Sequence, residues 1–441
     1  MLRKIAVFLA AAFIICSFSA CTVQEIDELY SLPQPREEYL QLQALIDAEI
    51  AAGSEYSAPT AGSFRQSVQL TDLDGDGANE ALAFLAGDEG AKICVYRKIG
   101  ETYSLALSIM GDGSGCGRVE YADLDGDGIS EIMVSWRVSG DMRLLKAYSI
   151  KSWASTVLFR TSCTDFQIGD FNMDGTAEIA VLKFEAGVGS LDMYSLDASG
   201  EIFQSSAKLS ASLMSIDRFR VGAIDGGIPA LFVEGQYTDE ENTRFYLTDI
   251  IISVDGKLKN ITLSTETGDS TTKRRYQVYC TDINSDGVMD VPLAEKMLTQ
   301  PGSSAESYVF DWYSYSIGGE RALSASTYHC EADGWYIILP EQWREGFTVR
   351  RETNVLSGER AVVLSQADAD DNISDLLTIY ALSGENKRDR AKIPGRFVLL
   401  QGETVIYAAR LTGSEQPSEE QRRDLTDRFH LIYTEWNTGA L

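Results

Sequence analysis

From residue 63 to residue 328, short apolar runs alternate with polar segments that are rich in glycine and aspartate. In the first stretch the runs lie at 81–85, 93–97 and 103–107, and similar runs recur at 132–136 and 179–182. This alternation is typical of β-strands joined by turns. The spacing allows roughly four short strands in about 50 residues, which is the content of one propeller blade.

The N-terminal part changes to helical spacing. Leu42, Leu45, Ile46 and Ile50 recur at intervals of three or four, which predicts a helix over 36–52 that ends before Gly53. We expect this helix and its lead-in, residues 36–62, to pack against the domain that follows. Residues 21–35 contain two prolines and are expected to be a tether.

Residues 329–441 are predicted to form a separate small α+β domain. Apolar runs predict five strands, at 334–340, 361–364, 376–380, 397–400 and 405–408. Ser418 followed by Gln421 is a capping box, which predicts the start of a C-terminal helix. The apolar face of that helix would carry Leu425, Phe429, Ile432 and Trp436.

A nine-residue acidic segment repeats through the first region. Four copies begin at Asp72, Asp123, Asp170 and Asp282, and a degenerate fifth copy spans 221–229. Successive copies are 51, 47, 51 and 61 residues apart. A regular step of this size indicates a propeller or solenoid array, and five units predict a mainly β fold, a five-bladed β-propeller over 63–328.

Each intact copy has the donor pattern of a calcium loop. Acids or amides at positions 1, 3 and 5 direct oxygens toward one point, glycine at position 6 allows the chain to reverse, and an acid at position 9 completes the set. We therefore predict about four calcium ions in a structural role. The predicted side-chain ligands are Asp72, Asp74, Asp76, Glu80, Asp123, Asp125, Asp127, Glu131, Asp170, Asn172, Asp174, Glu178, Asp282, Asn284, Asp286 and Asp290.

Other readings of these segments are less favoured. An acidic turn that binds nothing needs only one Asp or Asn and a glycine, not four donors in fixed register. An EF-hand needs an acid at position 12, where this chain has Ala83, Val134, Val181 and Leu293. Magnesium prefers a strict octahedron and keeps its waters.

The chain is strongly acidic and has an export signal. Its 66 Asp and Glu outnumber 38 Lys and Arg, for a net charge of −28, which disfavours nucleic acid as a partner. Arg3 and Lys4 precede an apolar stretch at 5–15, and small residues precede Cys21. This pattern resembles a lipoprotein signal peptide over 1–20, with lipid on Cys21, and places the chain on the outer face of a bacterial membrane. An ordinary secretory signal, with Cys21 incidental, is the alternative.

The sequence offers little to an enzyme, and we expect no catalytic activity. The cysteines after Cys21 form no CxxC pair and are expected to be buried. Both histidines, His329 and His430, lack a motif and are expected to be structural, His430 on the face of the C-terminal helix. Tyr308, Phe310 and Trp312 alternate in an aromatic row, for which the interior of a half-buried strand is favoured over an exposed sugar-stacking surface.

The acidic loops resemble the FG-GAP or VCBS-like repeats of integrin α-subunits and bacterial surface proteins, over residues 63–328. Residues 55–70 also resemble the lead-in of VCBS-repeat lipoproteins of gut Clostridia. The resemblance implies a propeller braced by calcium at its rim, with any ligand on the opposite face. Val221, Ala223 and Pro229 depart from the motif, so the degenerate copy should bind no metal.

These features together predict a lipid-anchored calcium-binding module at the cell surface that binds an extracellular protein or glycan. Two alternatives stay open. One is a surface hydrolase or carbohydrate-processing accessory, because paired carboxylates are abundant. The other is a structural spacer that holds the C-terminal domain away from the membrane.

Overall fold

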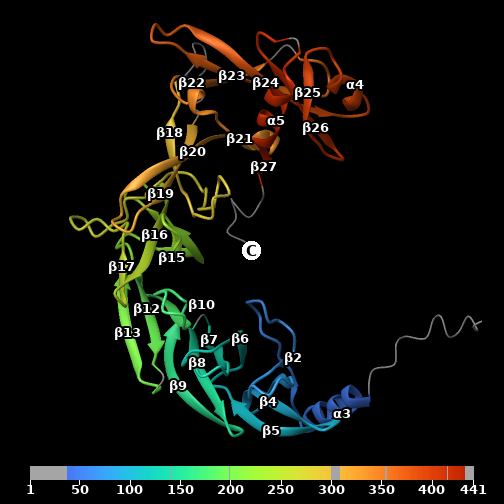
Figure 1. The fold of residues 1–441 in the computed structure, drawn as a ribbon, viewed down its shortest axis with the longest axis vertical. Coiled ribbons are helices and arrows are strands. Elements are labelled where there is room, and N and C mark those ends of the chain that lie inside the picture. The colour runs from blue at the N-terminus through green and yellow to red at the C-terminus, as the bar shows by residue number, and fades with distance from the viewer. Residues whose placement is uncertain are drawn as a thin grey trace, which may run out of the picture.

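The computed structural model describes residues 37–140, 142–197, 199–298, 308–352, 355–414 and 416–432. The fold is mainly β, with six antiparallel sheets that follow one another along the chain (Figure 1). The predicted signal peptide, Cys21, the whole predicted tether and Trp436 lie outside the described residues. Within these ranges, no helix is both long enough and apolar enough to cross a bilayer.

The first four sheets are meanders. The strands of the first are β1 (Glu55–Tyr56), β2 (Val68–Thr71), β3 (Glu80–Gly87), β4 (Gly90–Ile99) and β5 (Thr102–Met110). Those of the second are β6 (Gly115–Ala122), β7 (Glu131–Ser139), β8 (Met142–Lys151) and β9 (Ala154–Cys163). The third has β10 (Asp165–Gly169), β11 (Glu178–Glu185), β12 (Val188–Leu196) and β13 (Ile202–Lys208). The fourth has β14 (Ser215–Ile224), β15 (Ile228–Thr238), β16 (Arg244–Val254) and β17 (Lys257–Asn260).

The last two sheets take strands from the C-terminal region. The fifth contains β18 (Val291–Lys296), β19 (Tyr308–Tyr315), β20 (Arg321–Cys330), β21 (Trp335–Ile338) and β27 (Phe429–Leu431). The sixth contains β22 (Phe347–Glu352), β23 (Glu359–Ala367), β24 (Ile373–Ser383), β25 (Arg396–Gln401) and β26 (Val405–Leu411). The α-helices are α3 (Glu37–Ala51), α4 (Lys387–Ala391) and α5 (Glu419–Asp427), and short 3₁₀ turns lie at Glu331–Asp333 and Glu341–Trp343.

The apolar runs predicted as strands are buried between neighbouring sheets. In β3, Leu82 and Phe84 share a core with the second sheet. Ala81, Ala83 and Leu85, which point to the other face, share a core with α3. Because both faces are covered, the run is continuously apolar rather than alternating.

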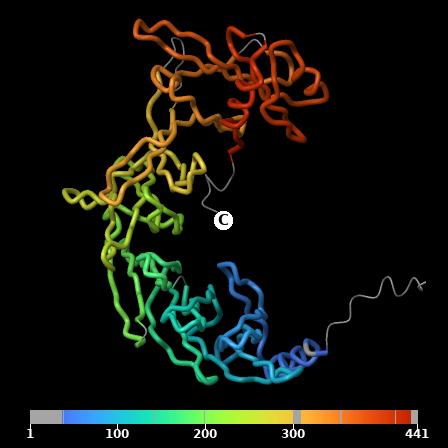
Figure 2. Tube along the Cα trace, in the orientation of Figure 1, coloured from blue at the N-terminus to red at the C-terminus, as the bar shows by residue number. Residues whose placement is uncertain are grey.

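The sheets lie along an open arc whose two ends do not meet (Figure 2). This differs from the closed ring that a propeller implies. At one end, Leu42 and Ile46 of α3 cover the face of the first sheet that a further sheet would occupy. The sixth sheet lies at the other end (Figure 1), and β27 pairs with β21, so the outer edge of the fifth sheet is filled from the C-terminus. No described strand of the first sheet pairs with the fifth or sixth.

Two expectations about the C-terminal region are corrected. The boundary between residues 328 and 329 falls inside β20, because β21 and β27 continue the fifth sheet. The C-terminal helix begins at the predicted capping box but ends at Asp427. Phe429 and His430 then lie in a strand, where backbone pairing with β21 outweighs helical spacing. The packing of Phe429 against Trp335 and Tyr407 supplies the apolar contact.

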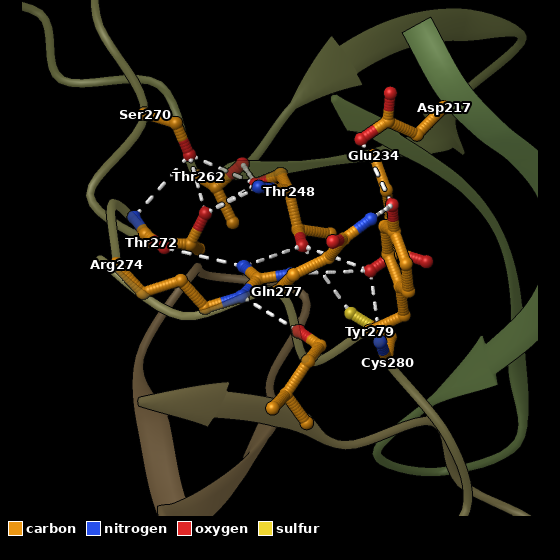
Figure 3. Close-up of polar contacts among 11 residues, drawn as sticks. Asp217, Glu234, Thr248, Thr262, Ser270, Thr272, Arg274, Gln277, Tyr279 and Cys280 are labelled. Carbon is orange, nitrogen blue, oxygen red and sulfur yellow. Dashed lines mark hydrogen bonds and ion pairs between the residues drawn. The ribbon is translucent and has the colours of Figure 1, made fainter. Parts of the chain in front are cut away.

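The fourth sheet has a short outer strand, and β17 pairs only with the end of β16. The segment that follows β17 covers the remaining edge of β16 with side-chain hydroxyls (Figure 3). The Thr248 N–H donates to Oγ1 of Thr272 at 2.7 Å, and the Thr248 carbonyl accepts from Oγ of Ser270 at 2.8 Å. The Ile250 N–H donates to Oγ1 of Thr262. These bonds satisfy backbone groups that an outer strand would otherwise pair.

A buried ion pair fastens the same segment to the centre of the sheet (Figure 3). Nη2 of Arg274 lies 3.3 Å from Oε1 of Glu234, and both side chains are almost fully buried. The guanidinium also donates to Oγ1 of Thr248 and to the Val278 carbonyl, and Oε1 of Glu234 accepts the Cys280 N–H. This network connects β15, β16 and the segment before β18.

We predict that Arg274→Met lowers the free energy of unfolding by about 3–5 kcal/mol, because it leaves the Glu234 carboxylate buried without its cation. Urea unfolding measures the change. Arg275→Met is the matched control, since Arg275 is exposed and only stacks on Phe245, so it should cost about 1 kcal/mol or less. Equal losses in the two variants would contradict the role assigned to the ion pair.

Candidate metal centres

The four acidic segments occupy equivalent places in the fold. Three of them connect two successive paired strands of a sheet, β2 to β3, β6 to β7 and β10 to β11, and the fourth directly precedes β18. The residue at position 2 of each loop is apolar and buried, and it anchors the loop to the core. These anchors are Leu73, Leu124, Phe171 and Ile283.

The aspartate at position 1 organises the backbone of its own loop. In the first loop, Asp72 accepts the N–H of Gly75 through Oδ1 at 2.8 Å and that of Gly77 through Oδ2 at 2.9 Å. Asp123 makes the same pair of bonds in the second loop. In the third and fourth loops, position 1 accepts the N–H groups of positions 5 and 6. The loops are therefore closed by the chain's own hydrogen bonds.

The acid at position 9 lies at the start of the second strand, or directly before β18, and is buried. One of its oxygens accepts the N–H of position 2 in all four loops, at 2.9, 2.9, 2.8 and 3.2 Å in chain order. In two loops the other oxygen, Oε1 of Glu131 and Oδ1 of Asp290, is buried and makes no hydrogen bond of good geometry with the described residues, although the nearby hydroxyls of Ser149 and Ser324 act to lower the pKa of these acids. A buried carboxylate oxygen with no donor is costly, and a cation would satisfy it. The donor set thus fits a hard cation with oxygen ligands.

The electrostatics of position 9 agree with this fit. Burial and then the nearby carboxylates raise the pKa of Glu80 and of Glu178 to about 7, and that of Asp290 to about 6. The pKa of Glu131 is raised as well, chiefly by burial. A nearby cation would oppose both causes, because it favours the charged form.

The structure brings the acids of three loops together. Three groups of carboxylates have oxygens within 4.8 Å of one another; they are Asp72, Asp74 and Glu80, then Asp123, Asp125 and Asp127, then Asp170, Asp174 and Glu178. Asp76 and Glu131 lie outside these groups, although the sequence pattern includes them. Among the described residues, Asp282, Asp286 and Asp290 do not form such a group.

The first three loops lie side by side along one edge of the arc. A methyl group on Gly75, at position 4 of the first loop, would be 3.6 Å from Cγ1 of Ile129 in the second. One on Gly126 would be 3.5 Å from Cγ2 of Thr176 in the third. Position 4 has positive φ in every loop, and Met173 is 62% exposed there in the third, where the next copy along the chain is the degenerate one. The third loop is therefore the last of the three neighbouring loops.

A family model described as an FG-GAP-like repeat matches residues 72–134, which hold the first two loops and the strands between them. Residues 72–134 are therefore similar to an FG-GAP-like repeat. No curated protein matches it.

Two solved structures of low similarity complete the comparison. One is a protein from Lactobacillus plantarum, 10% identical, covering 72% of this chain and 85% of that one, with a TM-score of 0.28. The other is the exotype rhamnogalacturonan lyase YesX, 11% identical, covering 82% and 91%, with a TM-score of 0.28. Scores this low carry no argument about this chain.

The degenerate copy of the FG-GAP-like motif forms a tight turn instead of a loop. Val221 and Ala223 are strand residues of β14, and Asp225 begins the turn into β15. The Asp225 N–H donates to the Tyr315 carbonyl, which ties the turn to the fifth sheet. Without acids at positions 1, 3 and 9, this copy lacks the donors that the other four have.

The remaining candidate residues are placed in the interior. His329 is partly buried against Phe310, and desolvation lowers its pKa to about 3, so its imidazole is neutral. His430 lies in β27 rather than on the C-terminal helix, and its ring stacks on that of Tyr336 in β21. Phe310 and Trp312 are buried, as favoured from their alternation. Cys94, Cys116, Cys163, Cys280 and Cys330 are buried free thiols, as expected.

A hollow of about 1010 Å³ lies at the opposite end of the first two sheets from their FG-GAP-like loops. Glycine-rich turns at 86–90 and 111–114 line it, together with residues 53–55 and Val138. Its acidic side chains include Glu55, Asp88 and Glu89. This hollow was not predictable from the sequence, because two turns 20 or more residues apart must meet to form it.

Proposed function

We propose that this chain is an extracytoplasmic calcium-binding protein of the bacterial cell surface, anchored by lipid on Cys21, in which calcium is structural. The observation that carries the proposal is the buried acid at position 9. It recurs with the same hydrogen bond in four loops, and in two of them it keeps a buried oxygen that makes no hydrogen bond of good geometry with the described residues. Calcium accepts such irregular sets of carboxylate, amide and backbone oxygens.

Calcium would supply positive charge to the loops. Its proposed role is structural, and it would take no part in a reaction of a bound partner. Its predicted ligands are the sixteen oxygen donors at positions 1, 3, 5 and 9. The acids of this chain serve the loops, and therefore we propose a role without catalysis. Extracellular modules bind calcium at about 10⁻⁴–10⁻³ M, which suits an exported protein.

We further propose that the stabilised arc presents a surface to an extracellular protein or glycan. A partner at the hollow would meet Glu55, Asp88 and Glu89, so a partner with positive charge is favoured there. The open arc also supports a second candidate, a spacer, because α3 and the sixth sheet lie at its opposite ends (Figure 1). A pull-down that captures a specific partner separates the module from the spacer.

We expect the purified chain to bind about four calcium ions, and EDTA to lower its melting temperature. At a calcium concentration ten times Kd, each site stabilises the folded state by about 1.4 kcal/mol. Equilibrium dialysis counts the ions, and thermal unfolding with and without EDTA measures the stabilisation.

Asp76→Asn should weaken one site about tenfold, because it removes one ligand charge. Asp225→Asn in the degenerate copy is the matched control, and it should change neither calcium binding nor the melting temperature. A chain that binds no calcium, and whose melting curve EDTA leaves unmoved, would contradict the proposal.

The anchor is tested separately. We expect the chain, expressed in a bacterium grown with labelled palmitate, to carry the label and to sediment with membranes. Cys21→Ser should release the chain from the membrane fraction and remove the label, because the thiol is the acceptor. Labelling that persists in Cys21→Ser would contradict the assignment of Cys21 as the lipidated residue. Cys94→Ser is the control for a buried thiol.

A further inference from the structure

A lysine lies among the carboxylates of the second FG-GAP-like loop. Lys151 is the last residue of β8, and its Nζ is 2.8 Å from Oδ2 of Asp127 and 3.2 Å from Oδ2 of Asp125. These acids are positions 5 and 3 of the loop. The Lys151 side chain is 57% exposed, so the ammonium can leave the loop without unfolding the sheet.

The equivalent residues of the neighbouring units have no such charge. Pairing between the second and third strands aligns Ala81 with Tyr96, Ile132 with Tyr148, and Ile179 with Tyr194. The residue three positions beyond each tyrosine is Ile99 in the first unit, Lys151 in the second and Asp197 in the third. The lysine is therefore a feature of the second unit and not of the repeat.

The second loop is also the one with an acidic loop on each side. The first and third loops approach it at Gly75 and Gly126. The sequence places four acids in the first loop, four in the second and three in the third. Like charges at this spacing repel one another, and the middle loop feels both neighbours. Without a cation, the middle loop is the one that most needs a compensating positive charge.

We propose that Lys151 is an internal counter-ion of the second loop, which neutralises Asp125 and Asp127 when calcium is scarce and competes with calcium for them. The second loop is then the weakest site of the row and the one that fills last as calcium rises. This inference rests on the proposed calcium binding.

The test is a calcium titration of the purified full chain and its Lys151→Met variant by isothermal titration calorimetry. The variant should bind calcium about three- to tenfold more tightly at one site, because exchange of a partly exposed ion pair is worth up to about one power of ten. Its melting temperature in EDTA should fall below that of the parent chain. At saturating calcium the two melting temperatures should converge, which a merely structural role of the lysine would not produce.

Two further variants complete the design. Ile99→Lys places an ammonium at the equivalent position of the first unit and should weaken one site by a similar factor. Lys257→Met removes an exposed lysine of β17, away from the loops, and controls for net charge. If Lys151→Met does not fold, Ile99→Lys still tests the competition.

The outcomes separate the inference from the proposed function. A chain that binds no calcium overturns both. Calcium binding with the same affinities in Lys151→Met, Lys257→Met and the parent chain overturns the inference alone. Unchanged affinities in Ile99→Lys also contradict it.

Discussion

A buried carboxylate at the ninth position of each acidic loop is the constraint on which the arc depends. Glu80, Glu131 and Glu178 each begin the second strand of a sheet, and Asp290 directly precedes β18. A buried charge costs several kcal/mol unless it is paired. The one hydrogen bond that these acids receive in all four loops comes from the N–H of position 2. The loop around each acid must therefore supply positive charge, or the acid must take up a proton. The acids that gather at positions 1, 3 and 5 make sense as the rest of a cation's shell.

The fourth sheet is connected to its neighbour by a different kind of contact, which replaces an acidic loop. Its loop has become a tight turn, and the buried pair of Glu234 and Arg274 connects the sheet to the segment before β18. Hydroxyls of Thr262, Ser270 and Thr272 cover the edge that its short outer strand leaves open. The chain thus carries two kinds of joint, one whose acids would need a cation from outside the protein under the proposed function and one whose cation is its own. Lys151 is intermediate between them, because its ammonium lies among the acids of the second loop.

The sequence predicted the local structure well, because strands and loops are determined mainly by residues that are close together along the chain. The apolar runs at 81–85 and 132–136 became β3 and β7, and the helix over 36–52 became α3. Features that depend on distant residues were not predictable. The open arc depends on how sheets far apart in the chain are arranged, and the end of α5 follows from pairing of Phe429 with β21. Lys151 gave no signal, because 24 residues separate it from Asp127 along the chain.

Hydrogen exchange at single backbone amides, with calcium and with EDTA, tests the central claim most directly. The amides of Leu73, Leu124 and Phe171 donate to the buried acids, whereas the amide of Thr248 donates to Thr272 in the metal-free joint. We predict that EDTA accelerates exchange at the three loop amides and leaves that of Thr248 nearly unchanged. Exchange rates that EDTA does not alter, or that rise equally at Thr248, would contradict a structure held together by cations in its loops.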